Sequence, residues 1–225
     1  MFRRRTLIIS AALLTLTNAA TAASLSDHFA FRNSADLPPA PLLLDLDRNG
    51  FNLSEPGIGV TFDISAKGES NYIQWVSVGT DDGFLAIDLN DNGIIDNGSE
   101  LFGKGTDLKL IGNKASNGYI ALRQYDLVEL GGNGDQRIDE KDKIWSSLKI
   151  WVDSNADGFS QSSEIKGISE HAINNINIKP RTTQNVNVRL DQAGNPMPFW
   201  LWVKQDVEQG PKQLKVADIY FRAIK

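Results

Sequence analysis

The residues best suited to chemistry in this chain are Asp, Asn and Glu side chains at fixed spacing in short loops. A Ca²⁺ ion binds about six to eight oxygen atoms, and a tightly curled loop of about twelve residues supplies them around a glycine at its sixth position. The loop that begins at Asp153 fits this pattern throughout. Its predicted ligands are Asp153, Asn155, Asp157, the carbonyl of Phe159, Gln161 and Glu164, with Gly158 at the turn. Because the full pattern rarely arises by chance, we predict a calcium site here, with a solvated acidic turn as the alternative.

A second loop begins at Asp88 and repeats the spacing with one irregularity. Its predicted ligands are Asp88, Asn90, Asn92, the carbonyl of Ile94, and Asp96. Position 12 is Ser99, and Glu100 comes one residue late. We predict that Glu100 closes this site if the chain bulges, because an acid at the end of the loop completes the coordination shell.

Three further loops match less well. The loop Asp45, Asp47, Asn49 has Pro56 at position 12, so it is predicted as a half-site that needs Glu55 or a neighbouring loop. The loop that starts at Gly131 has no first ligand and has Gln136 in the glycine position. Its predicted ligands are Asn133, Asp135, Asp139 and Asp142. The loop from Asp63 has Lys67 at a ligand position and is predicted not to bind metal.

Short apolar strands precede the three clearest loops and are expected to position them. They are Leu42–Leu44, Phe84–Ile87 and Ile150–Val152. The pattern predicts one α+β domain, residues 42–225, in which short strands lead into calcium loops and helices follow some of them. The other predicted elements are helices at Ser116–Leu130 and Ser162–Ile173, antiparallel strands at Asn185–Leu190, Phe199–Val203 and Leu214–Phe221, and turns at Asn195–Pro196 and Gly210–Pro211.

The first 22 residues have the composition of a secretory signal peptide. Three arginines, Arg3 to Arg5, precede an apolar run that ends at Leu16, and Ala20-Thr21-Ala22 is a small-residue cleavage motif. Residues 23–41 then read as a flexible tether. We therefore expect a periplasmic or secreted protein without a membrane span.

Charge and cysteine content limit the partners. Loss of the three arginines, with no acid removed, lowers the net charge from -5 to -8, which argues against nucleic acid as a partner. The chain has no cysteine, so a disulfide cannot stabilise it. A bound cation is the obvious substitute.

Several motifs, in order along residues 41–221, resemble the calcium-dependent, EF-hand-like module of large secreted RTX (haemolysin-type) exoproteins. The similar segments are Pro41–Gly50, Trp75–Ser77, Asp82–Gly103, Asn117–Leu122, Leu148–Gly158, Ser160–Glu164 and Ala217–Phe221. The resemblance implies a calcium scaffold. Some members of that family also cut an Asp-Pro bond before the first strand through an internal anhydride on the aspartate. Here the dipeptide is Ala40-Pro41, and no Asp-Pro occurs in the chain, which argues against cleavage.

Other classes of function compete with calcium binding. Paired carboxylates would suit a hydrolase, but the acids fall in loop spacing, and neither His28 nor His171 has a motif partner. Trp200 and Trp202 could form a platform for a sugar or peptide, although a buried strand is the simpler reading. We expect calcium to order the loops after export and so to create a surface for a protein or surface glycan. A calcium-stabilised enzyme is the competing class.

Overall fold

The computed structural model describes residues 40–179, 186–187, 200–209, 212–221 and 224, and these form a mixed fold made mostly of strands. Within that part of the chain the one α-helix is α2 (Gly118–Arg123). It is accompanied by the 3₁₀ helices η1 (Gln124–Asp126), η2 (Val128–Leu130), η3 (Trp145–Ser147) and η4 (Ile168–His171). The α+β assignment therefore holds, with antiparallel strands as the dominant element.

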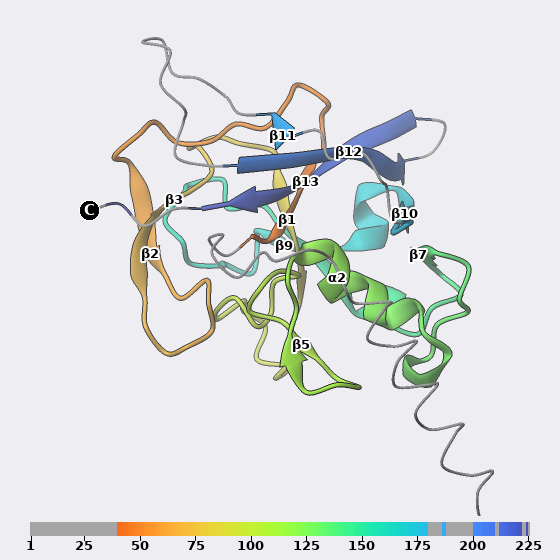
Figure 1. Cartoon of the computed structure of the whole chain (residues 1–225). Helices are drawn as coiled ribbons and strands as arrows, with labels where there is room; N and C mark the ends of the chain where they lie inside the picture. Colours follow the sequence, from red (N-terminus) through yellow and green to blue (C-terminus); the bar gives the residue numbers. More distant parts are fainter. Residues whose placement is uncertain (1–39, 180–185, 188–199, 210–211, 222–223, 225) are drawn as a thin grey trace, which may run out of the picture. The chain divides into compact units, whose positions relative to one another are not determined.

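The main sheet joins strands that are far apart in the sequence (Figure 1). Its order is β7 (Arg137–Asp139), β10 (Ile173–Asn177), β12 (Trp200–Gln209), β13 (Lys212–Tyr220), β1 (Leu42–Asp45), β4 (Gly83–Ile87), β8 (Leu148–Trp151) and β9 (Ile165–Gly167). Every neighbouring pair is antiparallel, and β11 (Val186–Asn187) pairs with β12. The central strands β1 and β4 are buried along their whole length, as the apolar runs Leu42–Leu44 and Phe84–Ile87 require, and the buried Asp45 ends β1.

Two small hairpins and an aromatic cluster complete the core. The hairpins are β2 (Gly59–Phe62) with β3 (Asn71–Gln74), and β5 (Asp107–Leu108) with β6 (Asn113–Lys114). The Trp75 ring lies 4.6 Å from Phe84 and 5.7 Å from Trp151 between centroids, and Phe62 and Phe221 pack on the same cluster. These rings lie directly behind the acidic loops, since β4 and β8 lead into the loops that begin at Asp88 and Asp153.

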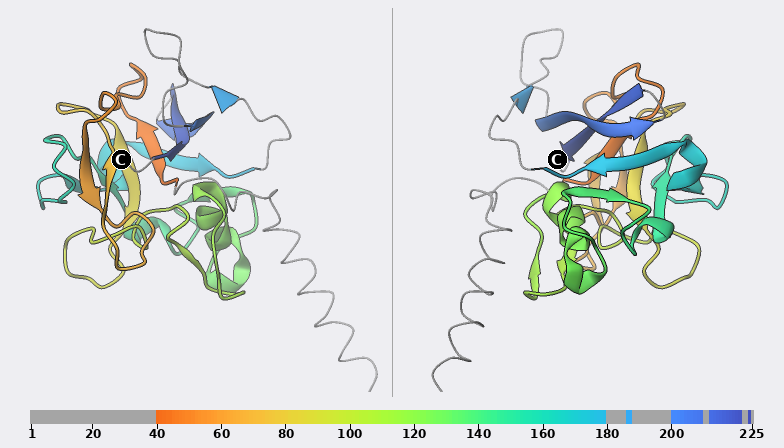
Figure 2. Two further views of the ribbon diagram at one scale, coloured as in Figure 1. Left: turned by 60° about the vertical axis from the view of Figure 1, so that its left-hand side comes forward. Right: turned by 90° about the vertical axis from the view of Figure 1, so that its right-hand side faces the viewer.

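The helix predicted at Ser116–Leu130 is interrupted. The Asn117 side chain caps α2 by accepting from the Ile120 amide at 2.9 Å, but Leu127 is extended, with ψ 138°, and divides the rest into η1 and η2. In both views of Figure 2 this green segment lies below the main sheet. The Gly118 amide donates to Asp218 Oδ1 at 2.7 Å, which fixes the start of α2 against β13.

The prediction of a helix at Ser162–Ile173 is wrong, because these residues include a strand and a 3₁₀ helix. Residues Ile165–Gly167 form β9, which pairs with Lys149–Trp151 of β8, and η4 follows before β10 begins at Ile173. The edge of β8 offers backbone hydrogen bonds that outweigh the local helical pattern.

The C-terminal strands agree with expectation where the chain is described. Strand β13 covers nearly all of Leu214–Phe221, β12 runs beyond the predicted Phe199–Val203, and β11 falls within Asn185–Leu190. The predicted signal peptide, most of the tether, both predicted turns, His28 and the side chains of Trp200 and Trp202 lie outside the described residues. At the end of the predicted tether, Ala40 and Pro41 are buried, and Pro41 O accepts from the Ile219 amide at 3.1 Å. No helix in the described part is long and apolar enough to cross a membrane.

Candidate metal-binding loops

The loops from Asp153 and Asp88 have the same backbone conformation. In each, the glycine amide at position 6 donates to the carboxylate at position 1: Gly158 to Asp153 Oδ2 at 2.9 Å, and Gly93 to Asp88 Oδ2 at 2.8 Å. Both glycines have positive φ, at 76° and 82°, and the residues at position 4 do as well, at 55° and 56°. Glycine adopts this conformation without a steric penalty, which explains its place in the spacing.

The closing acids occupy matching places although their positions in sequence differ by one. Glu164 accepts from the amides of Ser154 and Gln161, at 3.2 and 3.3 Å, which are positions 2 and 9 of the loop. Glu100 accepts from the amides of Leu89 and Asp96, at 2.9 and 2.7 Å, which are also positions 2 and 9. The extra residue is accommodated in the turn at 97–99, so Glu100 reaches the end of its loop.

Side chains at the predicted ligand positions converge within each loop. In the Asp153 loop, Asn155 Nδ2 and Gln161 Nε2 donate to Asp157 Oδ2 at 2.9 and 2.8 Å. In the Asp88 loop, Asn90 Nδ2 and Asn92 Nδ2 donate to Asp96 Oδ2 at 2.9 and 2.8 Å. The amide hydrogens supply the positive partner of each carboxylate. Rotation of the same amides would present their oxygens, the ligand atoms that Ca²⁺ prefers.

The Asp153 loop is bonded to the aromatic core. Asp153 is fully buried, and Trp75 Nε1 donates to its Oδ2 at 2.6 Å. At the other end of the loop, Trp151 Nε1 donates to Glu164 Oε2 at 3.4 Å. Burial raises the pKa of the Asp153 carboxyl above its ordinary value, partly offset by the hydrogen bonds it accepts from Gly158 and Trp75.

A distant segment, and not the exposed Glu55, contacts the loop that begins at Asp45. The Asp47 amide donates to Asp81 Oδ2 at 2.9 Å. Asp82 lies beside Asp45, because β1 and β4 pair through Leu44 and Gly83. Asp82 and Asp45 are fully buried, and each has an Oδ1 without a hydrogen-bond partner.

Electrostatics at this half-site reflect the crowding of carboxylates. Burial is the main cause that raises the pKa of Asp82 to about 6, and the charges of Asp81 and Asp45 add to it. Lys215 Nζ lies 3.8 Å from Asp45 Oδ2.

The sequence analysis did not predict that Asp81 and Asp82 lie near this loop, although their place directly before an apolar strand was a usable signal. Two of the predicted ligands of the loop are in contact, because Asn49 Nδ2 donates a hydrogen bond to Asp47 Oδ2 at 2.5 Å.

The loop from Gly131 brings its four predicted ligands together. Asn133 Nδ2 donates to Asp135 Oδ2 at 2.9 Å, and the Asp139 amide donates to Asp142 Oδ2 at 2.8 Å. Asp142 is 3% exposed, and burial raises its pKa. Gln136 stands in the glycine position with φ 67°.

The loop from Asp63 has the same turn as the other loops but carries a cation at a ligand position. The Gly68 amide donates to Asp63 Oδ2 at 2.7 Å, and Ala66 at position 4 has φ 53°, as in the other loops. Lys67 nevertheless brings an ammonium group to a ligand position. Among the residues that the structure describes, no group of three or more His, Cys, Asp or Glu side chains is arranged to hold a metal ion. The candidate sites therefore depend on Asn and backbone oxygens as well as carboxylates.

Comparison with known proteins places this arrangement in a family. The model of the SPM domain matches residues 42–210, well over half of the chain. The chain belongs to the SPM domain family. This SPM domain is also 42% identical over 140 residues to the iron-regulated protein FrpA of Neisseria meningitidis serogroup C. That match covers 61% of this chain but 12% of FrpA, so the chain corresponds to a small part of that relative.

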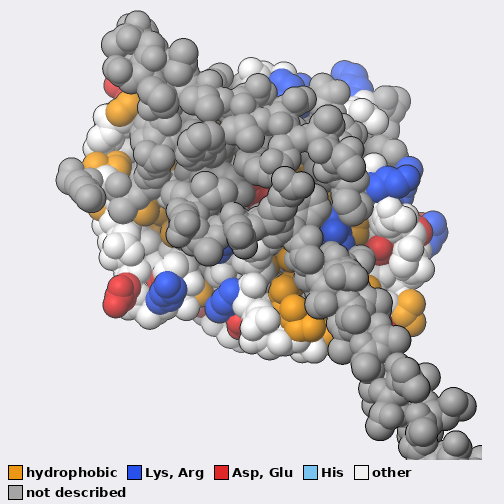
Figure 3. Space-filling model, viewed as in Figure 1, with side chains coloured by type: hydrophobic (Ala, Val, Ile, Leu, Met, Phe, Trp, Pro, Cys, Tyr) orange, Lys and Arg blue, Asp and Glu red, His pale blue; other side chains and the backbone are white. Residues whose placement is uncertain are grey.

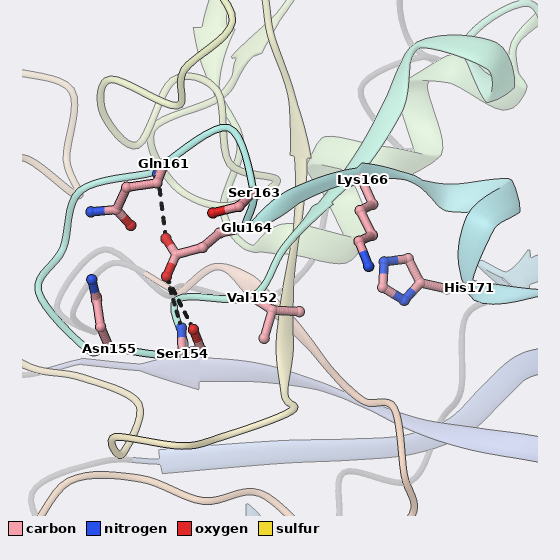
Figure 4. Close-up of a pocket in the computed structure, with 8 residues that line it drawn as sticks. All are labelled: Val152, Ser154, Asn155, Gln161, Ser163, Glu164, Lys166 and His171. Carbon is pink, nitrogen blue, oxygen red and sulfur yellow. Dashed lines mark hydrogen bonds between the residues drawn. The ribbon is translucent and has the colours of Figure 1, made fainter.

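The SPM domain has an open pocket of about 600 Å³ beside its Asp153 loop, shown in Figure 4. Glu164 is hydrogen-bonded within the loop, while Lys166 and His171 lie together farther along the pocket. Burial lowers the pKa of His171, and the charge of Lys166 lowers it further. His171 is in η4, not in the predicted helix. The neighbouring Glu170 opposes the pKa shift with its charge, but its carboxylate accepts a hydrogen bond from the Gly167 amide.

Proposed function

We propose that this SPM domain is an exported calcium-binding module whose loops become ordered and rigid when Ca²⁺ binds. The observation that carries the proposal is the burial of loop carboxylates. Burial is the largest cause that raises the pKa values of Asp153, Glu100 and Asp142, each of which stands at the first or closing position of a loop.

A buried carboxylate costs free energy unless a positive partner compensates it. Amide groups provide only partial positive charges here. The sequence of each loop, with its closing position, carries at least three acids. A divalent cation would restore the lost solvation with full charge, and oxygen ligands in a flexible loop suit Ca²⁺ better than Mg²⁺.

Binding would couple to folding by mass action. A site that binds Ca²⁺ a hundred times more tightly than the ambient concentration adds about 2.7 kcal/mol to the free energy of unfolding. Two such sites equal a large part of the stability of an ordinary domain. The resemblance to RTX exoproteins, the SPM family and the similarity to FrpA support this function and an extracytoplasmic location.

The surface offered to a partner would include the loops themselves. The side chains at position 7 of the two best loops are apolar and exposed, 71% for Phe159 and 43% for Ile94. Both line one pocket between the loops, together with Phe62 and Ser160. Figure 3 shows that, on one face, apolar side chains lie in small groups among charges of both signs. Ordering of the loops would fix these two apolar side chains for a protein or glycan.

Calorimetric titration of the chelated protein with Ca²⁺, with Mg²⁺ as the control ion, tests the proposal. We expect two or more calcium ions to bind saturably, and Asp153→Asn to remove one of them. Asp63→Asn is the matched control, because it changes the same position of the loop that carries Lys67. The absence of calcium binding, or a metal-free form as resistant to heat as the calcium form, would refute the proposal.

A further inference from the structure

The loop from Gly131 has the backbone of the other loops without their first side chain. Gly134 and Gln136, at positions 4 and 6, have φ 74° and 67°, like Ala156 and Gly158 at 55° and 76°. A glutamine seldom adopts this conformation. Another group must therefore hold the turn in place of the missing aspartate.

That group is Asp126, which precedes the loop by five residues. The Gln136 amide donates to Asp126 Oδ2 at 2.9 Å, the same bond that Gly158 makes to Asp153 at 2.9 Å. The Gly134 amide also donates to the backbone carbonyl of Asp126, at 2.9 Å. Asp126 thus has the contacts of a first-position aspartate.

Residues 127–132, between Asp126 and Asn133, form a short insertion that brings the chain back to Asp126. Leu127 is extended, η2 follows, and Gly131 reverses the chain with φ 88°. The Gly132 amide then donates to Leu127 O at 2.9 Å. A Cβ on Gly132 would lie 2.2 Å from the carbonyl carbon of Asp126, so this close approach requires glycine.

The remaining oxygen of Asp126 is free to bind a ligand. The side chain is 3% exposed, and Oδ1 is buried with no hydrogen-bond partner. Burial raises the pKa of this carboxyl, and the charges of Asp142 and Asp135 raise it further. The neighbouring guanidinium of Arg123 donates to Ile178 O at 3.1 Å, while its charge is attracted to Asp126.

We propose that Asp126 Oδ1 is the first ligand of a third Ca²⁺ site, completed by Asn133, Asp135 and Asp142. The three carboxylates do not form a ready-made metal cluster in this structure, so their side chains would have to move together around the ion. The proposal rests on the calcium-binding function proposed above and adds a ligand that the spacing of the loop does not contain. Asp142 would close the site, as Glu164 and Glu100 close the other two, because its carboxylate accepts from the amide at position 9.

Proton–nitrogen NMR spectra of the full protein during titration with Ca²⁺ test this site separately from the others. The amides of Gln136 and Gly158 report the third loop and the Asp153 loop. We expect both to shift saturably in the unmodified protein. Asp126→Asn should abolish the Gln136 shift and reduce the calorimetric stoichiometry by one ion, while the Gly158 shift remains.

Two further variants complete the experiment. Asp135→Asn changes an exposed ligand, so it should remove the same shift without affecting folding. Glu129→Gln removes a nearby exposed charge and should leave binding unchanged. A Gln136 amide that does not shift while Gly158 does, or that still shifts in Asp126→Asn, would overturn this site and leave the proposed function standing. If neither amide shifts, both proposals fall.

Discussion

Ser160 and Ile95 join the two best loops at the same position of each. The Ile95 amide donates to Ser160 Oγ at 2.6 Å, and Ser160 Oγ donates to Ile95 O at 3.3 Å. Both residues are at position 8, and both are buried. The two loops are therefore joined directly through their backbones, and we expect a movement in one loop to reach the other.

Removal of this link should uncouple the loops. In the unmodified protein we expect the amides of Gly93 and Gly158 to follow one Ca²⁺ binding curve. In Ser160→Ala we expect two curves, together with a loss of about 1–3 kcal/mol in stability, because the buried Ile95 amide loses its acceptor. NMR titration measures the first effect and urea unfolding the second. Ser162→Ala, at an exposed position, is the control and should show neither. Independent curves in the unmodified protein would disprove the coupling.

Tryptophan fluorescence should report occupancy of the Asp153 loop. The Trp75 indole donates to Asp153 Oδ2, so coordination of a cation by Asp153 changes the field at the ring. We expect a saturable change in emission when Ca²⁺ is added, reversed by a chelator. Trp75→Phe should remove most of the change, and Asp153→Asn should remove it as well. Constant emission during calorimetrically observed binding would contradict this prediction.

The metal-free protein should lose stability as the pH rises from about 4 to about 6.5. The pKa of Asp82 is about 6 in the folded state against an ordinary value of 3.8, so the folded state binds more protons in this interval. Since stability falls with pH wherever the folded state holds the extra proton, the loss due to Asp82 is about 1–3 kcal/mol. Urea unfolding with a chelator at several pH values measures it.

The same titration in two variants identifies the group responsible. Asp82→Asn cannot ionise, so it should be more stable than the unmodified protein at pH 7 and should show a shallower slope. Glu69→Gln, which alters an exposed acid, should follow the unmodified protein. An unchanged slope in Asp82→Asn would exclude Asp82 as the source.

The protein should remain intact in calcium. The resemblance to RTX exoproteins raises self-cleavage at an Asp-Pro bond, which needs an aspartate before the proline, and the residue here is Ala40. The bond is nevertheless held firmly: Leu42 N donates to Phe102 O at 2.9 Å, and a Cβ on Gly103 would lie 2.7 Å from Ala40 O.

Mass spectrometry after incubation with Ca²⁺ or chelator tests this expectation. No fragment should arise from the unmodified protein. Ala40→Asp restores the missing carboxylate, so we expect it to break between residues 40 and 41 only when calcium is present. A calcium-dependent fragment from the unmodified protein would show that a different residue acts.

The sequence alone determined the parts of the sites that are local. A first-position aspartate and the glycine five residues later bond to each other, so their spacing predicts the turn wherever it occurs, including the loop from Asp63. Apolar runs before the loops likewise predicted strands β1, β4 and β8, because a strand buried on both faces needs no polar alternation.

Only the tertiary structure decided which distant groups contact each loop. The Asp47 amide donates to Asp81, 34 residues away, and the Gln136 amide donates to Asp126 across the insertion at 127–132. The spacing within a twelve-residue loop encodes neither contact. Pairing with β8 likewise converted part of the predicted helix Ser162–Ile173 into β9. Hydrogen bonds and charges act through space, so the chain's path through the sheet, and not its local pattern, selects these partners.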